Sequence, residues 1–308
     1  YDGAPRDAIT DFMRTRPYRL LCTATAAPND YVELGTSSEA LGVMERKHML
    51  AQFFTHDGGD TSKWRIKGHA REGAFWRWVC SWARACRRPS DIGFCDEGFD
   101  LKALSIRDHI VQASKPLDGF LFDLPAVGLE EQRSDLRRTI DERCGMAAQL
   151  ANGHDGPCVA WTNLNAEADE LARQIRGAVN VQGSDKDEAK EEAFAAFASG
   201  EIRVIVSKPS IAGFGLNWQH CAHMTFFPSH SYEQFYQCVR RCWRFGQTRP
   251  VVVDMITTDG QRNVLRNMER KAEASDRMFG QLVEHMRDEL KIEKTTGYNN
   301  KEEIPSWL

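Results

Sequence analysis

The chain has 308 residues, of which 42% are hydrophobic and 27% charged, so it can bury one large core or two ordinary ones. Its formal net charge of -4 excludes a general attraction to polyanions, so a nucleic-acid contact has to come from a local basic patch. Because no run of 18 apolar residues occurs and no signal-peptide pattern opens the chain, the sequence predicts neither a membrane span nor secretion.

Nine cysteines are scattered along the chain without a C-x-x-C pair, a usage typical of reduced thiols in a cytosol. His220, Cys221 and His223, together with Cys238 and Cys242, raise the question of a zinc site. Their spacing matches none of the common zinc-ligand patterns, so we expect no metal site and a cytoplasmic protein.

The first predicted element is a buried strand and turn over residues 18–30, "YRLLCTATAAPND", where an apolar run ends in small residues and Pro-Asn-Asp. A short helix is expected after it. The chain begins with Tyr1 rather than Met, and we expect it to be a piece of a longer protein.

Residues 62–88 form a basic, aromatic window with eight Lys or Arg, one acidic residue and four tryptophans. Its large side chains recur at helical spacing, which predicts one core-facing side (Phe75, Trp78, Val79, Trp82 and Cys86). The alternative is that the cations outside that side contact the phosphates of a nucleic acid. Arginines interleaved with aromatic residues are a weak pattern by themselves, so we prefer the core interpretation.

The middle of the chain is loop-rich over residues 89–128, with some strand character at residues 117–125, "LDGFLFDLP". A helix with a polar face is predicted over residues 128–153, where Asn152 and Gly153 are typical of a helix end.

From residue 157 onward, short apolar runs alternate with helical patterns. This alternation predicts an α/β fold with a parallel sheet covered by helices on both faces. A long helix is expected after Asp259, followed by a polar tail. The predicted strands cover residues 158–162, 178–181, 202–207, 223–228 and 251–256, and the predicted helices between them cover residues 165–177, 184–200 and 231–245.

Three polar side chains form a stripe on the helix predicted over residues 231–245. Gln237, Arg241 and Arg244 are spaced i, i+4 and i+7, which places them on one side of a helix, while Phe235 and Phe245 are among the residues available to the buried side. The stripe is either a solvated face or a pair of guanidiniums that reach a polyphosphate, which the planar fork of arginine binds through two oxygens.

A glycine-containing loop, "SKPSIAGFGLNWQ" (residues 207–219), follows the predicted strand at residues 202–207. Gly213 and Gly215 would let backbone amides approach a ligand closely, and the loop follows the carboxyl end of a strand, where α/β sheets bind ligands. Many turns between a strand and a helix carry two glycines, so the loop alone is a weak indication.

The order of these elements is more specific. A strand, "SKPSIAGFGLN", a second strand and then "QCVRRCWRFGQ" together resemble motifs V and VI of superfamily 2 helicases, most closely the Snf2-like branch. That branch's motif VI reads Q-x-x-x-R-x-x-R-x-G-Q, which is matched here by Gln237, Arg241, Arg244, Gly246 and Gln247. "YRLLCTATAAPND" resembles motif III through Thr23 and Thr25, and "VQGSDKDEAKEEAF" resembles the segment before motif V. The window at residues 49–83 is similar, more loosely, to helicases of phages and mobile elements.

The Walker A pattern G-x-x-x-x-G-K-[ST] does not occur in the 308 residues, and "DERC" (residues 141–144) follows no apolar strand, so it is not a DExx box. The resemblance therefore implies a C-terminal part of a helicase or translocase of a bacterial or phage-infected cell. It divides the chain into the end of a first RecA-like lobe (1–45), a mainly helical insertion (46–105), a linker and helix (106–153), the second RecA-like lobe (154–258), and a C-terminal helix and tail (259–308).

The resemblance implies an ATP site in which Arg241 and Arg244 act as catalytic arginine fingers on the γ-phosphate. ATP and Mg²⁺ would be held mainly by the first lobe, in the same protein or a separate subunit. The residues implied to contact ATP from this chain are Gly213, Gly215, Asn217, Gln237, Gly246 and Gln247.

Nucleic acid is the implied partner, with DNA favoured over RNA and with contacts to the backbone rather than to the bases. The residues implied to make these contacts are Gly183, Ser207 and Lys208, while Thr23 and Thr25 would couple them to the ATP cleft. Two alternatives stay open. One is a non-hydrolysing RecA-like module that binds nucleic acid or a partner. The other is a Rossmann-type enzyme, for which the expected acidic residue about 20 positions after the glycine loop is missing.

Overall fold

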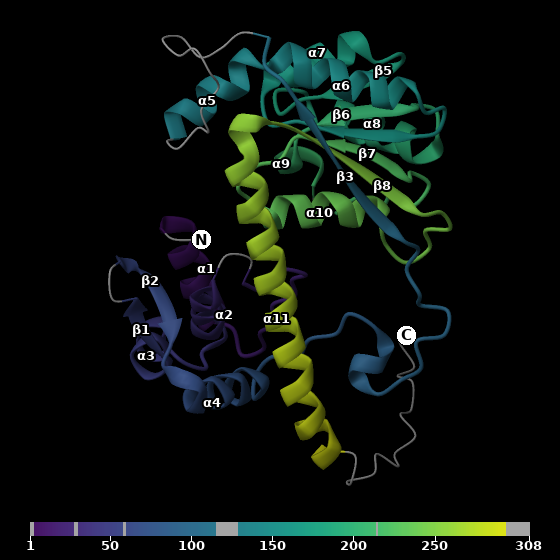
Figure 1. Ribbon diagram of the computed structural model, residues 1–308. Coiled ribbons are helices and arrows are strands. Elements are labelled where there is room, and N and C mark those ends of the chain that lie inside the picture. Colours follow the sequence, from purple (N-terminus) through teal and green to yellow (C-terminus); the bar gives the residue numbers. More distant parts are fainter. Residues whose placement is uncertain (1–2, 28–29, 58–59, 115–128, 214, 294–308) are drawn as a thin grey trace. The chain divides into compact units, whose positions relative to one another are not determined.

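A computed structural model describes residues 3–27, 30–57, 60–114, 129–213 and 215–293 of the chain. The chain forms two compact units, one of Tyr1–Phe99 with Glu273–Leu308 and the other of Asp100–Ala272 (Figure 1). Within the described part, none of the helices combines the length and apolar character that a membrane crossing requires.

The unit of Asp100–Ala272 contains a six-stranded sheet in which every neighbouring pair is parallel. This confirms the predicted α/β class with a parallel sheet. In spatial order, the strands are β3 (Leu104–Val111), β8 (Val251–Thr258), β7 (His223–Phe226), β4 (Cys158–Trp161), β6 (Val204–Ser207) and β5 (Ala178–Val181). All but β3 were predicted from the apolar runs.

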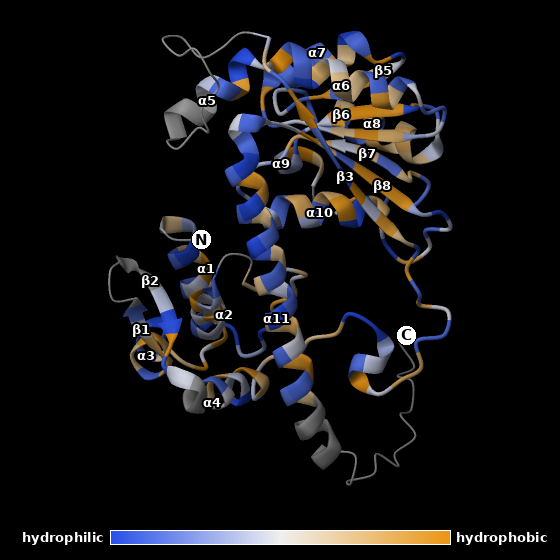
Figure 2. Cartoon of the chain, in the orientation of Figure 1, coloured by the Kyte–Doolittle hydropathy of each residue, from blue (hydrophilic) through white to orange (hydrophobic). Residues whose placement is uncertain are grey.

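Helices cover both faces of this sheet, because strands β4, β6 and β7 are buried along their whole length and need apolar cover on each side. One face packs against α6 (Ile140–Asn152) and α7 (Asn165–Gln174). The other packs against the start of α11 (Arg262–Glu293) and against α8 (Asp187–Ser199), α9 (Pro209–Ala212) and α10 (Tyr232–Cys242). In Figure 2, the hydrophobic colour gathers on the central strands.

The edge strand β3 was not predicted. It pairs only with β8, and Ile106 and Ile110 are about half exposed, so its sequence mixes apolar and charged residues instead of forming an apolar run. The strand character predicted at residues 117–125 lies outside the described residues. The helix predicted over 128–153 is two helices, α5 (Leu129–Arg138) and α6, separated at Thr139.

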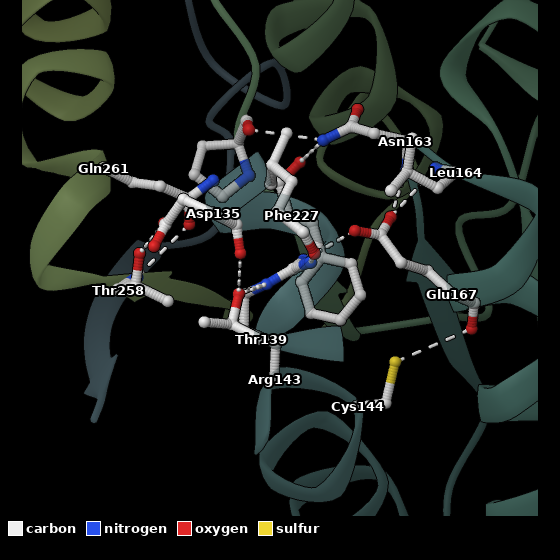
Figure 3. A network of polar contacts seen from close by, with 12 residues as sticks. Asp135, Thr139, Arg143, Cys144, Asn163, Leu164, Glu167, Phe227, Thr258 and Gln261 are labelled. Carbon is white, nitrogen blue, oxygen red and sulfur yellow. Dashed lines mark hydrogen bonds and ion pairs between the residues drawn. The ribbon is translucent and has the colours of Figure 1, made fainter. Parts of the chain in front are cut away.

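A buried polar network joins α6 to the carboxyl ends of strands β4 and β7 (Figure 3). Arg143 and Glu167 are both fully buried, with 2.6 Å between Nη1 and Oε1. Asn163 lies two residues after the end of β4. Its Nδ2 donates at 3.0 Å to the carbonyl of Phe227, the residue that follows β7. The network extends to β8, where Thr258 Oγ1 donates to a carboxylate oxygen of Asp135 at 2.7 Å. It therefore fixes the turns that follow three neighbouring strands.

The other unit is built from helices, a hairpin and part of α11. Its core is aromatic and sulfur-rich, with Phe75, Trp76 and Met49 fully buried, and it is completed by Met278 and Met286 from the far end of the chain. Its elements are α1 (Ala4–Arg14), η1 (Tyr31–Glu33), α2 (Leu34–Leu41), α3 (Arg46–Phe53), the antiparallel pair β1 (Phe54–Asp57) and β2 (Asp60–Ile66), α4 (Gly68–Cys80) and η2 (Pro89–Ile92).

The strand predicted over residues 18–30 is absent from the part of this segment that the structure describes. Residues 18–27 have no regular secondary structure, and Tyr18 and Leu20 are 93% and 81% exposed. No backbone hydrogen bond joins residues 18–24 to the backbone of another described residue, whereas a strand requires such a partner. The apolar run therefore has the composition of a buried strand but no sheet to bury it. The assignment of residues 1–45 to the end of a first lobe stays a prediction.

The core interpretation of the basic window is confirmed for Phe75 and Val79, which are fully buried. The window is less helical than predicted, since β2 precedes α4, and Cys86 is exposed. Some of its cations are held within the unit, because Arg87 lies 2.7 Å from a carboxylate oxygen of Asp276. The window is therefore mainly a structural element.

Candidate functional site

Helix α10 carries the predicted polar stripe. Ser231 caps it by accepting a hydrogen bond from Gln234 N at 3.3 Å, and Phe235 belongs to its buried side as predicted. The helix ends at Cys242, three residues earlier than expected. As a result, Phe245 is 61% exposed and does not serve the buried side, which corrects the prediction. Arg244 consequently lies beyond the helix rather than on it.

Arg241 is only 8% exposed, and each nitrogen of its guanidinium donates to an acceptor within the sheet unit. Nε donates to Gln237 O at 3.0 Å, Nη2 to Gln237 Oε1 at 3.1 Å, and Nη1 to Leu216 O at 2.9 Å. Burial lowers the pKa of Arg241, and the positive charge of Arg244 adds to this effect, while Cys238 opposes it. The side chain is a charged cross-link between α10 and the segment after Gly215.

Arg244 has a different setting. Its Nη1 donates to Oδ1 of Asn217, an exposed residue, and its Nε is buried without a hydrogen-bond partner among the described residues. The two predicted arginine fingers therefore meet the same segment, Leu216 and Asn217, through different kinds of acceptor. Arg241 uses a backbone carbonyl, and Arg244 uses a side-chain amide.

The glycines predicted to contact ATP have local structural reasons. A Cβ on Gly213 would lie 2.1 Å from Pro209 O, so this glycine allows the chain to pack closely against the short helix α9. Gly215 and Gly246 have φ values of +77° and +89°, in the left-handed region that favours glycine. These positions shape the loop around Asn217 and the turn after Arg244.

Gln247 is buried, and its side-chain amide is occupied by the backbone. Nε2 donates to Cys221 O at 2.8 Å and to Cys242 O at 3.3 Å, while Oε1 accepts from Arg249 N at 2.9 Å. In this structure Gln247 joins the end of α10 to the start of β7, so its polar atoms are not offered to a ligand.

The residues predicted to contact nucleic acid lie at the carboxyl ends of β5 and β6. Ser207 is fully buried, and its hydroxyl donates to Val181 O at 3.0 Å, so the structure does not offer this side chain to a nucleic acid. Lys208 is half-buried and precedes α9. Gly183 faces α9, because a Cβ on it would lie 3.9 Å from Ile211 Cδ1. Lys208 and Gly183 are thus grouped around one short helix.

Thr23 and Thr25 belong to the other unit. Thr25 N donates to Thr23 Oγ1 at 3.0 Å, which makes a local turn in the segment that was predicted to be a strand. The structure therefore brings Gln237, Arg241, Arg244 and Asn217 together within one unit, while the two threonines belong to the other.

Sequence reasoning missed the backbone groups of this site. Trp218 N donates to Arg241 O at 2.9 Å, and Trp243 Nε1 donates to Lys102 O at 2.6 Å, just before β3. The carbonyl of Leu216 is a further acceptor that no residue pattern marks.

Comparison with known families bears directly on this part of the chain. Residues 142–246 match the family described as Helicase conserved C-terminal domain. The match covers about a third of the chain. It begins within α6 and ends at Gly246, so it contains β4 to β7 and both arginines, as predicted from the resemblance to superfamily 2 helicases. The match does not single out the Snf2-like branch, and no curated protein matches this chain in sequence.

Three solved structures are among those similar to this one. They are the C-terminal part of the Fun30 ATPase domain (13% identity, TM-score 0.34), E. coli DEAD-box protein SrmB bound to regulator of ribonuclease activity A (14%, 0.39) and T4 UvsW (12%, 0.41). The similarity covers 52%, 56% and 58% of this chain and 53%, 85% and 40% of theirs, respectively. The chain thus spans about half of the Fun30 structure.

Proposed function

We propose that this chain is the C-terminal part of an ATP-dependent nucleic-acid helicase or translocase and supplies its second RecA-like lobe. The observation that carries this proposal is the meeting of Arg241 and Arg244 with one segment, Leu216 and Asn217, inside a helicase C-terminal domain. Guanidinium and amide N–H groups are suitable donors for phosphate oxygens. The side chains of Arg241, Arg244 and Asn217 therefore fit the phosphate end of a nucleotide.

ATP would supply the phosphoryl group that is transferred to water. Gln237, Asn217 and the two arginines include no carboxylate, so we assign the Mg²⁺ ligands and the phosphate cradle to the preceding lobe. The guanidiniums would stabilise the charge that spreads over the phosphoryl oxygens during transfer. Because they belong to a different lobe from the cradle, hydrolysis would require the two lobes to close on the nucleotide.

Nucleic acid, with DNA favoured, would be bound through its backbone by Lys208 and the surroundings of Gly183. Thr23 and Thr25 would couple the nucleotide to this contact from the first lobe. The unpaired apolar run at residues 18–24 supports the proposal that this segment completes a sheet outside the 308 residues. Contacts to phosphates carry little sequence preference, so we expect binding to depend strongly on salt.

The test is DNA-stimulated ATP hydrolysis by the protein that includes the preceding lobe. Replacing Arg244 by alanine should lower turnover by about 10³-fold or more, while nucleotide binding stays nearly unchanged. Arg240→Ala is the matched control, because Arg240 lies on α10 beside Arg241 and its guanidinium lies over the rings of Tyr236 and Trp243. Full turnover in Arg244→Ala would contradict the proposal, as would ATP hydrolysis by the 308-residue chain alone.

The second candidate is a module that binds nucleic acid or a partner and hydrolyses nothing. It is favoured by one observation, namely that the donors of Arg241 are already satisfied within the unit. Salt-dependent DNA binding without ATP turnover in the longer protein would decide for this candidate.

A further inference from the structure

The segment Leu216–Cys221 is held along its length by the segment that runs from Arg241 to Arg249. Both segments belong to the sheet unit, and Figure 1 shows α9 and α10 on the same side of the sheet. Besides the two arginine contacts already described, the bonds between the segments are Trp218 N to Arg241 O (2.9 Å), Gln247 Nε2 to Cys221 O (2.8 Å) and Arg249 Nη2 to His220 O. The loop after Gly215 is therefore positioned by the end of α10.

Within this arrangement, Arg241 is anchored by four hydrogen bonds. Three leave its guanidinium, and the fourth arrives at its own carbonyl from Trp218 N. Buried hydrogen-bonded charges are strongly destabilised when one partner is removed, because the remaining group stays buried and unpaired. Moving this guanidinium to a phosphate would break contacts to both Gln237 and Leu216 at once.

Arg244 meets the opposite conditions. It lies past the end of α10, where no helical hydrogen bond restrains it, and its side chain donates to the exposed amide of Asn217. An exposed bond between a charged donor and a neutral acceptor is weak, because water competes for both groups. A phosphate oxygen, which is charged, is a better acceptor for arginine than an amide oxygen.

We propose that the two arginines have different roles and that Asn217 is a resting partner for one of them. Arg241 is a positioning residue that fixes Leu216 and Trp218. Arg244 is the guanidinium that exchanges Asn217 for phosphate, so Asn217 competes with the ligand and sets the affinity. This inference rests on the proposed nucleotide site and narrows it, because of the two guanidiniums only Arg244 reaches the phosphate, and Asn217 competes with the phosphate for Arg244.

The test uses the 308-residue chain and inorganic tripolyphosphate as the probe. The Nε–Hε signals of Arg241 and Arg244 are followed by NMR during the titration, after assignment through their backbone neighbours. We expect the Arg244 signal to move to saturation and the Arg241 signal to stay in place and exchange slowly with solvent. Movement of the Arg241 signal, or no movement of either signal, would overturn the proposal.

Variants of Asn217 test the competition itself. Asn217→Ala removes the resting acceptor, so tripolyphosphate should bind about two- to tenfold more tightly, the range expected for one exposed hydrogen bond. Asn217→Asp strengthens the resting contact and should weaken binding. Arg240→Lys is the control, because the Arg240 guanidinium lies over the rings of Tyr236 and Trp243, and it should leave the midpoint of the titration unchanged. An unchanged midpoint in both Asn217 variants would show that Asn217 does not compete.

The failure of this inference can be told from the failure of the proposed function. If Arg244→Ala abolishes ATP turnover in the longer protein but tripolyphosphate moves the Arg241 signal, the motor function stands and the division of roles is wrong. If the longer protein hydrolyses no ATP but the Arg244 signal moves and Asn217→Ala binds more tightly, the division of roles stands and the motor function is wrong.

Discussion

Removing the carboxylate of Glu167 should be among the most damaging single changes in the sheet unit. Glu167 and Arg143 are both 0% exposed, and the carboxylate also accepts backbone N–H groups of Asn163 and Leu164 at 2.8 and 2.9 Å (Figure 3). Glu167→Ala would leave the Arg143 guanidinium buried without its counter-charge, which costs about 3–5 kcal/mol. Loss of the two capping bonds at the start of α7 adds about 1 kcal/mol.

Hydrogen exchange in β4 and β6 is the suitable measurement, because the chain has two units and a single unfolding transition is not assured. A total loss of about 4–6 kcal/mol corresponds to exchange that is faster by roughly three to four orders of magnitude. Glu170→Ala is the matched control on the same helix, because its ion pair with Arg173 is exposed and is worth less than about 1 kcal/mol. Equal effects of the two variants would refute the reasoning.

Two further predictions concern the loop and the sheet. Gly213→Ala should destabilise the sheet unit by about 1–3 kcal/mol, because the new Cβ would overlap with Pro209 O. Gly145→Ala is the control in α6, where a Cβ meets open space, and it should stabilise the unit. Thermal unfolding that is unchanged in both variants would contradict this prediction. Burial opposes the ionisation of Asp254, but hydrogen bonds from two histidines at 2.7 and 2.8 Å outweigh it and lower its pKa. A lowered folded-state pKa stabilises the fold above the unfolded value of about 3.9, and this contribution is lost as the pH falls through the folded value. The difference in melting temperature between the wild type and Asp254→Asn should therefore shrink from pH 5 to pH 3, and a constant difference would argue against the role of Asp254.

Most of the sheet could be predicted from the sequence because strands buried on both faces must be apolar along their whole length. That condition holds for β4, β6 and β7 and leaves a continuous pattern in the chain. It fails for β3, which exposes Ile106 and Ile110 at the edge of the sheet. The same criterion wrongly predicts a strand at residues 18–30, where the apolar composition is present but no described strand pairs with the segment.

The sequence alone determined the alternation of strands and helices and the i, i+4 spacing that places Gln237 beside Arg241, because both follow from the periodicity of regular structure. Only the tertiary structure decided what the arginines contact. The acceptor for Arg241 Nη1 is the carbonyl of Leu216, 25 residues away in sequence, and a backbone carbonyl is the same in every residue. Likewise, because α10 ends at Cys242, Arg244 lies outside the helix and donates to Asn217 instead of continuing the polar stripe. Side-chain patterns record which groups are present, but the satisfaction of each donor depends on segments that only folding brings together.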